Sequence, residues 1–428
     1  MDAQIISIGN ELLIGDTVNT NASWLGDYLT GVGFDVKEVH TIPDDQQIIT
    51  HYLDYAIHNA DLVICTGGLG PTHDDITKKA VADYFEVGYK LDEEVLNFIK
   101  DIFQKRNIPF TDSNRQQAEV PENSEVLFNT QGTAPGMWFD TGKASLAVLP
   151  GVPYEMKYLI RNRIAPKLRE KFGSIGYRYS RYIKTAGIGE STLSDKIIGD
   201  LSDYMTNGIS MAYLPAPGGV VLRVNAHADT EEDARELTAE IADEIYKRAG
   251  DYIYGEGKDT ELARELGVIL KKKGLMLAVA ESCTGGLVSN SITDIPGSSD
   301  YMAGGVVSYS NKAKSDLLDV KIESLQQYGA VSKEVALQMA KGVAEKMHAD
   351  IGLSTTGVAG PGGGTEEKPV GTVWIGFWSR EEHFAIKARL TNDRLLNKER
   401  SKMVVLETCR RTLLGMEELP YDLKKQLP

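Results

Sequence analysis

The stretch from Asp61 to Asp75 reads DLVICTGGLGPTHDD and decides the fold of the first part of the chain. Its apolar half, residues 61–66, predicts a strand that is buried on both faces. The glycines predict a tight loop, and the spacing of Thr77–Phe85 predicts a helix. A buried strand that runs through glycines into a helix N-terminus can bind an anion, because its backbone N–H groups point outward. The loop matches neither a P-loop nor GxGxxG.

The segments around this stretch repeat the same alternation of strand and helix. Strands separated by helices of ten residues or more pair in parallel, in a sheet that is covered on both faces. The pattern therefore predicts an α/β domain over residues 1–170. The predicted elements are strands at residues 5–8, 36–40 and 144–149, and helices at residues 21–32 and 48–60.

The first predicted strand ends in Gly9-Asn10-Glu11. Ligands of open α/β sheets bind at the carboxyl ends of the strands, so this loop and the glycine loop should border one crevice. Asn10 and Glu11 can then contact a nucleotide or a metal. Asn21, at the start of the next helix, is expected to cap that helix.

Two aspartates end the glycine loop, although carboxylates repel phosphate. Mg²⁺ bound between a carboxylate and a phosphate would remove this conflict. The alternative is that each aspartate only caps the following helix. The cap is favoured for Asp74, and both roles stay open for Asp75. His73 is expected to be a surface loop residue.

The middle of the chain has a different texture and predicts a small α+β domain over residues 175–254. Residues 179–185 and 220–228 alternate as strands do. One charged amphipathic helix is expected at residues 231–248, capped by Thr230. No catalytic cluster is visible here, which favours a connecting role.

A third domain, again α/β, is predicted at residues 258–419, and the polar tail after Leu419 is expected to fray. Helices should separate its strands. These strands are predicted at residues 276–280, 305–309, 351–356 and 370–377.

A second strand-to-helix turn reads AESCTGG at residues 280–286. A hydroxyl at such a turn is exposed near the positive end of the helix, beside N–H groups that can hold an oxyanion. Ser282 needs a base to act as a nucleophile, and a tyrosine and two lysines follow the next strand. A lysine kept neutral by desolvation can be that base. The alternatives are that Ser282 only caps the helix and that Cys283 is the nucleophile.

A third glycine loop, residues 355–364, also follows an apolar strand. Its glycines can wrap a phosphate or form a long flexible turn. Arg394 is a candidate phosphate clamp, with a solvated surface position as the alternative.

Composition excludes several classes of function. The 428 residues carry 46 Lys and Arg against 61 Asp and Glu, a formal net charge of −15. This balance argues against general nucleic-acid or anionic-membrane binding. No apolar run of about 18 residues predicts a membrane span, and the N-terminus lacks a signal-peptide pattern. Three isolated cysteines predict no disulfide and no cysteine zinc site, and they favour a reducing cytoplasm.

Seven motifs resemble one family, the competence/damage-inducible CinA proteins, over nearly the whole chain. The N-terminal motifs are GNELL at 9–13, TGGLGPT with two aspartates at 66–75, GTAPG at 132–136 and LPGVPYEM at 149–156. The C-terminal motifs are ESCTGG at 281–286, YSN with Lys314 at 309–314, and GVAGP at 357–361. The resemblance implies a molybdopterin-binding-like α/β domain, a small α+β KH-type domain and a C-terminal α/β amidohydrolase domain.

For the C-terminal domain, the resemblance implies a nicotinamide-nucleotide amidohydrolase that needs no cofactor. It would convert nicotinamide mononucleotide to nicotinate mononucleotide and ammonia through an acyl-enzyme. Ser282 would be the nucleophile, Lys314 its base and Tyr309 an assisting group, whereas Lys312 does not match the family position. The residues that would hold the ribose phosphate are Thr284, Gly285, Thr356, Gly357 and Arg394.

For the N-terminal domain, the resemblance implies an ADP-ribose pyrophosphatase that uses a divalent metal, Mg²⁺ or similar, and yields AMP and ribose 5-phosphate. Asp75 would bind the metal, because it aligns with the single aspartate of the molybdopterin-type glycine loop. The residues that would line the nucleotide pocket are Asn10, Glu11, Gly67, Gly68 and Thr72.

The resemblance also suggests a cytoplasmic homodimer whose partners are small nucleotides and not membranes. Gly187-Ile188-Gly189 does not fit the GXXG loop of nucleic-acid KH modules, and Glu190 is acidic, so direct nucleic-acid binding is not expected. Two other functions stay open. One is a regulatory role in competence or DNA repair, and the other is molybdopterin binding, without catalysis in the N-terminal domain.

Overall fold

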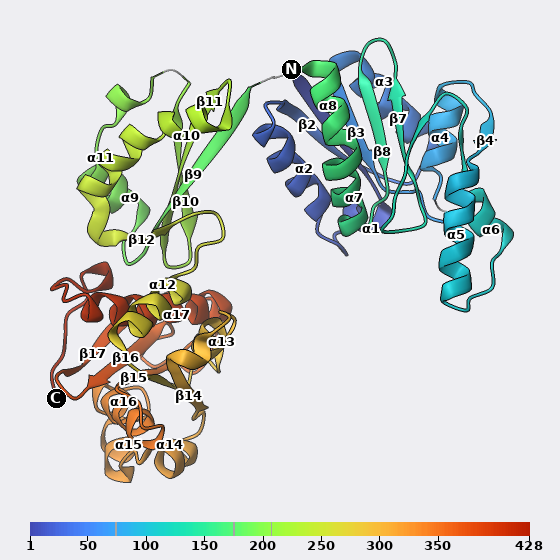
Figure 1. The fold of residues 1–428 in the computed structure, drawn as a ribbon. Coiled ribbons are helices and arrows are strands. Elements are labelled where there is room, and N and C mark those ends of the chain that lie inside the picture. Colours follow the sequence, from blue (N-terminus) through green and yellow to red (C-terminus); the bar gives the residue numbers. More distant parts are fainter. Residues whose placement is uncertain (73–74, 174–175, 207) are drawn as a thin grey trace. The chain divides into compact units, whose positions relative to one another are not determined.

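The structure is a computed structural model that describes residues 1–72, 75–173, 176–206 and 208–428 (Figure 1). The chain divides into two compact units, residues 1–179 with 227–234, and residues 180–226 with 235–428. In the described parts of the chain, no helix is long and apolar enough to cross a membrane.

A six-stranded sheet forms the centre of the N-terminal unit, in the order β2-β1-β3-β8-β7-β6. The four strands on the β2 side pair in parallel, as predicted. No strand was predicted at β7, which is antiparallel to β8 because a tight turn joins the two strands. The strands are β1 (Asp2–Ile8), β2 (Asp35–Ile42), β3 (Leu62–Thr66), β6 (Glu125–Leu127), β7 (Gly136–Asp140) and β8 (Ser145–Leu149).

Helices cover both faces of this sheet (Figure 1). Side chains alternate along β1, so Ile5 packs under α2 (Thr20–Gly31), α7 (Pro153–Leu159) and α8 (Ala165–Phe172). Its neighbour Ile6 packs under α3 (Gln46–Asn59) and α4 (Thr77–Tyr84) on the other face. The remaining elements of this unit are α1 (Asn10–Leu13), β4 (Tyr89–Leu91), α5 (Glu93–Lys105), α6 (Asp112–Gln116) and β5 (Glu119–Pro121).

Asn21 does not cap α2, contrary to the sequence prediction. The cap is Asn19, whose side chain accepts a hydrogen bond from the backbone N–H of Ala22 at 3.0 Å. Asn21 lies inside the helix and donates from Nδ2 to the Gly151 carbonyl at 2.7 Å. Asn19 and Asn21 are both suitable N-cap residues, and the sequence pattern does not show which of the two caps the helix.

The middle domain is a four-stranded sheet in the order β10-β11-β9-β12. Thr230 caps the following helix as predicted, since its Oγ1 accepts from the Asp233 N–H at 3.1 Å. The prediction of a single long helix is wrong, because the helix breaks at Thr238. The Thr238 hydroxyl donates to the Arg235 carbonyl. The elements are β9 (Tyr177–Thr185), α9 (Glu190–Thr192), β10 (Ser210–Ala216), β11 (Gly219–Ala228), α10 (Glu231–Leu237), α11 (Ala239–Ala249) and β12 (Ile253–Glu256).

The C-terminal domain is built on a five-stranded sheet in the order β14-β13-β15-β16-β17. The first three strands pair in parallel, but β16 and β17 are antiparallel. A helix was expected between every pair of strands, and none lies between β15 and β16, which a loop at residues 358–371 joins. The strands are β13 (Leu277–Glu281), β14 (Met302–Val307), β15 (Ile351–Gly357), β16 (Thr372–Ser379) and β17 (His383–Arg389).

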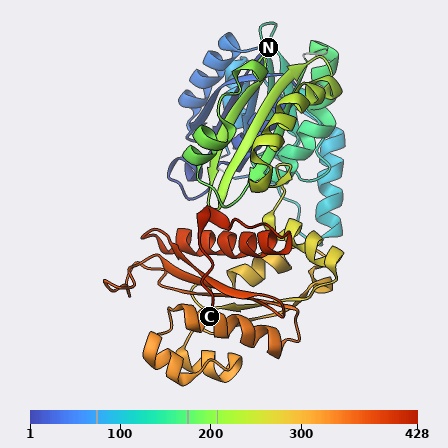
Figure 2. The same ribbon diagram turned by 90° about the vertical axis from the view of Figure 1, so that its left-hand side faces the viewer.

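Helices pack on the two faces of this sheet in separate clusters, and Figure 2 shows the long α17 on one face with the orange helices on the other. One face carries α12 (Leu262–Lys273), α13 (Leu287–Thr293) and α17 (Arg394–Leu413). The other carries α14 (Asn311–Leu318), α15 (Ile322–Tyr328) and α16 (Lys333–Lys346). The sheet therefore presents the carboxyl ends of β13, β14 and β15 at one edge.

The tail after Leu419 is docked, so the predicted fraying is wrong. Leu419 and Pro420 are buried. The Tyr421 N–H donates to the Gly187 carbonyl at 2.6 Å. Further along, the backbones of Ala385 and Gln426 exchange two hydrogen bonds.

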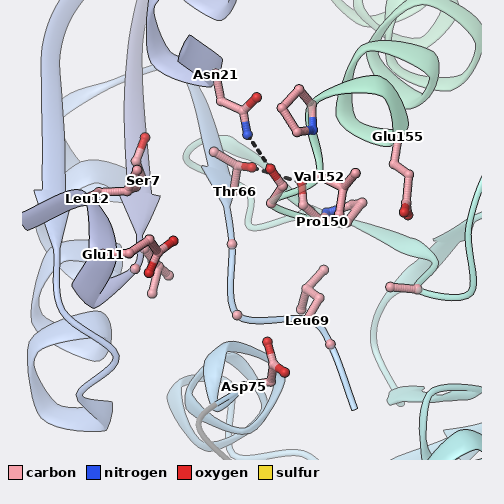
Figure 3. Close-up of a pocket in the computed structure, with 18 of the residues that line it drawn as sticks. Ser7, Glu11, Leu12, Asn21, Thr66, Leu69, Asp75, Pro150, Val152 and Glu155 are labelled. Atoms are coloured by element: carbon pink, nitrogen blue, oxygen red, sulfur yellow. Dashed lines mark hydrogen bonds between the residues drawn. The ribbon is translucent and has the colours of Figure 1, made fainter. Parts of the chain in front are cut away.

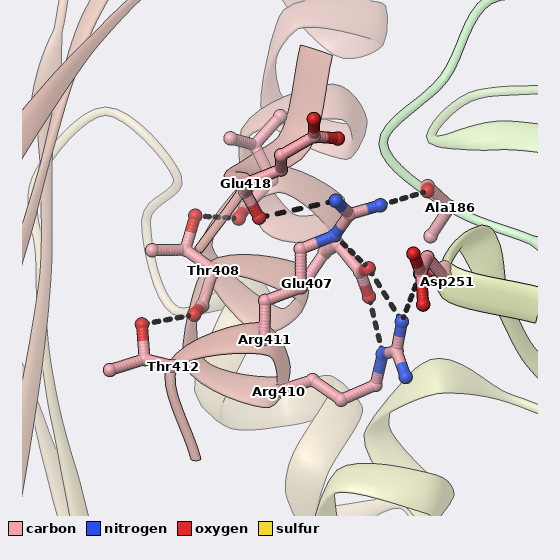
Figure 4. A network of polar contacts seen from close by, with 9 residues as sticks. Ala186, Asp251, Glu407, Thr408, Arg410, Arg411, Thr412 and Glu418 are labelled. Atoms are coloured by element: carbon pink, nitrogen blue, oxygen red, sulfur yellow. Dashed lines mark hydrogen bonds and ion pairs between the residues drawn. The ribbon is translucent and has the colours of Figure 1, made fainter. Parts of the chain in front are cut away.

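A buried ion network joins the middle domain to α17 (Figure 4). The Glu407 carboxylate accepts from Arg410 Nε at 2.8 Å and from Arg411 Nε at 2.7 Å. Arg411 also donates to the Ala186 carbonyl at 3.5 Å, and Arg410 donates to the Asp251 carbonyl at 3.4 Å. Removing the shared carboxylate would leave two buried guanidinium groups uncompensated, at a cost of about 3–5 kcal/mol.

Candidate active sites

The Ser282 hydroxyl lies at the carboxyl end of β13, in the turn that leads into α13. Its Oγ is 3.0 Å from Nζ of Lys314, and the side chain is buried. Gly285 and Gly286 complete the turn with φ angles of +63° and +96°, which side chains other than glycine rarely adopt. The structure therefore brings together the predicted nucleophile and the predicted base.

Lys314 is the buried lysine of the pair that sequence reasoning left open. It lies in α14, whose N-terminus is capped by Ser310, and its Nζ also donates to the carbonyls of Ser308 at 2.7 Å and Tyr309 at 3.4 Å. Burial lowers the pKa of Lys314 to about 8. As an ammonium, Lys314 donates from Nζ to Ser282 Oγ as well as to the two carbonyls. Once the amine has lost a proton, its lone pair can accept the proton of the Ser282 hydroxyl.

Lys312 points elsewhere. It is exposed, and its Nζ pairs with Asp316 at 2.6 Å. This ion pair raises the pKa of Lys312, so this lysine stays charged.

Glu281 caps α13, a role that sequence reasoning had offered to Ser282. One carboxylate oxygen accepts from the N–H groups of Gly286 and Val288 at 3.0 and 3.1 Å. The other accepts from the N–H and the hydroxyl of Ser289 at 2.8 and 2.7 Å. Because Glu281 is fully buried and satisfies the helix N-terminus, the Ser282 hydroxyl is left for Lys314.

Cys283 does not have the surroundings of a nucleophile. The side chain is buried, and burial raises the pKa of its thiol to about 11. A thiol with this pKa is almost entirely protonated near neutral pH. The alternative in which Cys283 attacks the substrate is therefore disfavoured.

Some of the residues predicted to hold the ribose phosphate are buried, whereas one, Arg394, is exposed. Thr284 and Thr356 are buried and bonded within the protein, Thr284 to the Thr355 hydroxyl at 2.7 Å and Thr356 to the Ala330 carbonyl at 2.7 Å. Gly357 ends β15, and Gly285 lies in the Ser282 turn.

Arg394, by contrast, is exposed at the start of α17. It donates to the Gly360 carbonyl at 2.9 Å and to the Tyr309 hydroxyl at 3.3 Å. Tyr309 is 65% exposed, so both side chains can reach a ligand.

Lys398 is a further cation near this site that the sequence analysis did not single out. It lies one turn after Arg394 in α17. Its Nζ is 3.7 Å from the position that a Cβ of Gly285 would occupy. The i, i+4 spacing places both cations on one helix face, and this spacing was the only sequence signal that could have identified Lys398.

The N-terminal unit contains a cavity of about 460 Å³ at the carboxyl ends of β1, β3 and β8. Of the predicted nucleotide-binding residues, Glu11, Gly67 and Gly68 line it, whereas Asn10 and Thr72 are not among the lining residues. A Cβ on Gly67 would collide with the Ile8 carbonyl, so only glycine allows β3 to turn this close to β1. Both expected loops therefore border one crevice, as predicted.

Several carboxylates face this cavity from different sides (Figure 3). Asp75 accepts from the Thr72 N–H at 3.0 Å and from the Thr72 hydroxyl. It does not cap α4, because the cap residue is Ile76 and no side chain bonds there. Asp74 and His73 lie outside the described residues. Among the described residues, no group of three or more His, Cys, Asp or Glu side chains is arranged as a metal site.

Glu155 is a cavity carboxylate that sequence reasoning quoted without assigning it a role. It is buried, and burial raises the pKa of its carboxyl group. The buried Asn129 donates to it at 2.7 Å and also to the Ala134 carbonyl at 2.9 Å. A Cβ on Gly132 would collide with this carboxylate, so the 132–136 loop folds directly over Glu155.

The fold and the two sites define a three-domain α/β protein with a crevice at the carboxyl ends of its N-terminal parallel strands and a separate Ser–Lys site. Residues 4–170 match the family described as probable molybdopterin binding domain. Residues 180–255 match the damage-inducible protein CinA KH domain, and residues 259–413 match the CinA C-terminal domain.

The relatives extend over the full chain. This chain is 45% identical to a CinA-like protein of Salinibacter ruber over 415 residues. The matched region covers 96% of this chain and 100% of that protein. A CinA-like protein of Chloroherpeton thalassium is 44% identical over 422 residues, 96% of this chain and 99% of that protein. A solved structure of a competence/damage inducible protein from Agrobacterium tumefaciens is 39% identical, covering 36% of this chain and 93% of that one, with a TM-score of 0.35. The chain belongs to the CinA family and has its three-domain architecture.

Proposed function

We propose that the C-terminal domain hydrolyses the carboxamide of nicotinamide mononucleotide to nicotinate mononucleotide and ammonia. The observation that supports this most is the 3.0 Å contact between Ser282 Oγ and the buried Nζ of Lys314. A serine is a weak nucleophile by itself and becomes effective when an adjacent base accepts its proton.

In this mechanism, neutral Lys314 takes the Ser282 proton while the oxygen attacks the carboxamide carbon. The tetrahedral intermediate collapses as the lysine ammonium protonates the leaving nitrogen, which releases ammonia and leaves a nicotinoyl ester on Ser282. A water molecule then loses its proton to Lys314 and attacks the ester. The ester bond to Ser282 breaks, Ser282 regains a proton, and nicotinate mononucleotide leaves.

The exposed cations beside the turn suit the phosphate of this substrate. Arg394 presents a guanidinium group for bidentate contact, and Lys398 adds a second positive charge one turn later. Tyr309 bonds to Arg394 and orients it. These residues would bind and position the substrate, whereas Ser282 and Lys314 would carry out the reaction.

The test is ammonia release from nicotinamide mononucleotide by the full chain, with and without EDTA. We expect activity that EDTA does not affect and that Ser282→Ala lowers by at least about 1,000-fold. Ser299→Ala, a surface serine of the same domain, is the matched control. A folded wild-type protein that releases no ammonia would refute the proposal and favour a regulatory role.

We further propose that the N-terminal domain hydrolyses ADP-ribose to AMP and ribose 5-phosphate with a divalent metal. The supporting observation is that Glu11, Asp44 and Asp75 line the same cavity as the glycine loop. Carboxylate oxygens are the ligands that Mg²⁺ prefers, and phosphate oxygens from the substrate would complete its shell. Asp75 would contribute a carboxylate oxygen to the ion, which would neutralise charge on the diphosphate and polarise it.

The test for this activity is AMP formation from ADP-ribose, with and without Mg²⁺. We expect turnover that EDTA abolishes and that Ser282→Ala leaves unchanged. Bound pterin in the purified protein, together with no turnover of ADP-ribose, would instead favour the molybdopterin-binding alternative.

A further inference from the structure

A second cavity, of about 560 Å³, lies in the C-terminal unit between the middle domain and the amidohydrolase domain. The middle domain contributes the 188–190 loop and the tip of the β10–β11 hairpin. The other walls are the end of β17, the middle of α17 and the docked tail at Tyr421 and Leu423. None of the residues assigned to the two catalytic sites lines this cavity.

Its lining is positively charged in a chain whose net charge is −15. Three cations, Lys387, Arg389 and Arg400, and one carboxylate, Glu190, line it. Lys387 lies over the Trp374 ring at 5.8 Å. In the described chain, neither Arg389 nor Arg400 forms a hydrogen bond or an ion pair through its guanidinium group. Arg400 interacts electrostatically with Tyr421, another lining residue. Arginines in a concave site that form no ion pair can bind an anionic ligand.

The floor of the cavity is apolar. Ile188, Val220 and Val404 are all buried to at least 96% and come from three different elements. Two prolines of the hairpin tip, Pro215 and Pro217, extend this surface towards solvent. The three floor side chains expose almost no surface, so a flat ring would stack on the exposed prolines of the hairpin tip while a phosphate reaches the two arginines. The volume lies within the range of small-ligand sites.

The walls are held by contacts that do not depend on a ligand. Gly187 donates to the Gly218 carbonyl at 2.9 Å and accepts from the Tyr421 N–H at 2.6 Å. Gly218 lies so close to Met403 of α17 that a Cβ there would collide with its side chain. The Glu407 network fixes the same joint (Figure 4). The cavity is therefore largely preformed, which lowers the entropic cost of binding.

We propose that this cavity is a binding site for a nucleoside monophosphate, with the phosphate between Arg389 and Arg400 and the base against Pro215 and Pro217 at the tip of the β10–β11 hairpin. The site is separate from the Ser282 site and does not depend on either proposed activity. Arg400 lies on the same helix as Arg394, so a ligand here contacts the helix that begins at the amidase site.

The test is hydrogen exchange of the full chain with AMP as the probe, because the protected peptides report where AMP binds. We expect AMP to protect the backbone around residues 187–190 and 215–220. The double variant Arg389→Ser/Arg400→Ser should raise the AMP concentration needed for half-protection by about tenfold or more for each arginine. Arg264→Ser, an exposed arginine of the same unit, should leave it unchanged.

Three outcomes would overturn the proposal. The first is no protection of these peptides at millimolar AMP, and the second is protection that the double variant does not weaken. The third, measured on the wild-type protein alone, is equal protection by inorganic phosphate or by adenosine, because the proposed site needs both the phosphate and the ring. Protection confined to the N-terminal cavity would count as the first outcome.

Discussion

The glycine loop after β3 and the serine turn after β13 are built alike but prepared differently for chemistry. Each follows a buried parallel strand, and glycines with positive φ shape each turn. At the serine turn, Ser282 and Lys314, the proposed nucleophile and base, are already in contact at 3.0 Å, and Lys314 is desolvated. At the glycine loop, carboxylates surround an open cavity of about 460 Å³, and the described residues contain no assembled metal site.

The difference lies in what the neighbouring strands contribute. After β14, the chain returns as α14 and places Lys314 against Ser282. After β8, the chain brings Gly151 and Glu155 to the cavity beside the glycine loop. These two residues can contact a ligand, but they do not activate a nucleophile. One local motif can therefore serve two chemistries, because the site is completed by elements distant in sequence.

The largest expected effect is on the serine side. Lys314→Met keeps the length of the side chain and removes the base, so amidase activity should fall about 10²–10⁴-fold. Thermal unfolding should stay the same or rise, because a buried amine is replaced by an apolar group. Lys312→Met is the matched control and should remain within twofold of the wild type. An equal loss in both variants would break the assignment of the base.

The pH dependence of the proposed amidase activity is a second test of Lys314 as the base. Burial lowers the pKa of Lys314 to about 8, and the proposed mechanism uses the neutral form of this lysine. Initial kcat/KM should therefore rise about tenfold per pH unit up to about pH 8 and then level off. A profile that is flat between pH 6 and pH 8 would contradict this role for Lys314.

In the N-terminal cavity, Asp75→Asn should weaken metal binding and leave the Ser282 site unaffected. The Mg²⁺ concentration for half-maximal turnover of ADP-ribose should rise about 10–100-fold. Ammonia release from nicotinamide mononucleotide by the same protein should not change. If Mg²⁺ dependence is unaltered, Asp75 acts only through its bond to Thr72.

The smallest effect is expected from the cap of α13. Glu281→Gln replaces a carboxylate oxygen that accepts two hydrogen bonds, so kcat should fall about tenfold with little change in KM. The free energy of unfolding should fall by about 1–3 kcal/mol, as measured by urea denaturation. Glu323→Gln, an exposed carboxylate on α15, is the control. A change in KM alone would place Glu281 in substrate binding instead.

Local patterns were sufficient for most of the fold. Apolar runs and glycine spacing predicted β1, β3, β8 and β13 and the helices α2, α4 and α13, because these signals depend on neighbours within a few residues. The errors have two causes. The antiparallel pairing of β16 and the docked tail depend on connections and contacts that no local pattern contains. The cap at Asn19 and the break at Thr238 depend on which side chain bonds to the nearby backbone.

The sequence by itself determined the chain's turns, its candidate nucleophile and its family. Only the tertiary structure showed that Lys314 and not Lys312 faces Ser282, since residues two apart on a helix point in different directions. It also transferred the helix cap from Ser282 to Glu281 and left Arg389 and Arg400 facing a cavity. These outcomes depend on how separate elements pack, and burial then sets the protonation of the groups that they enclose.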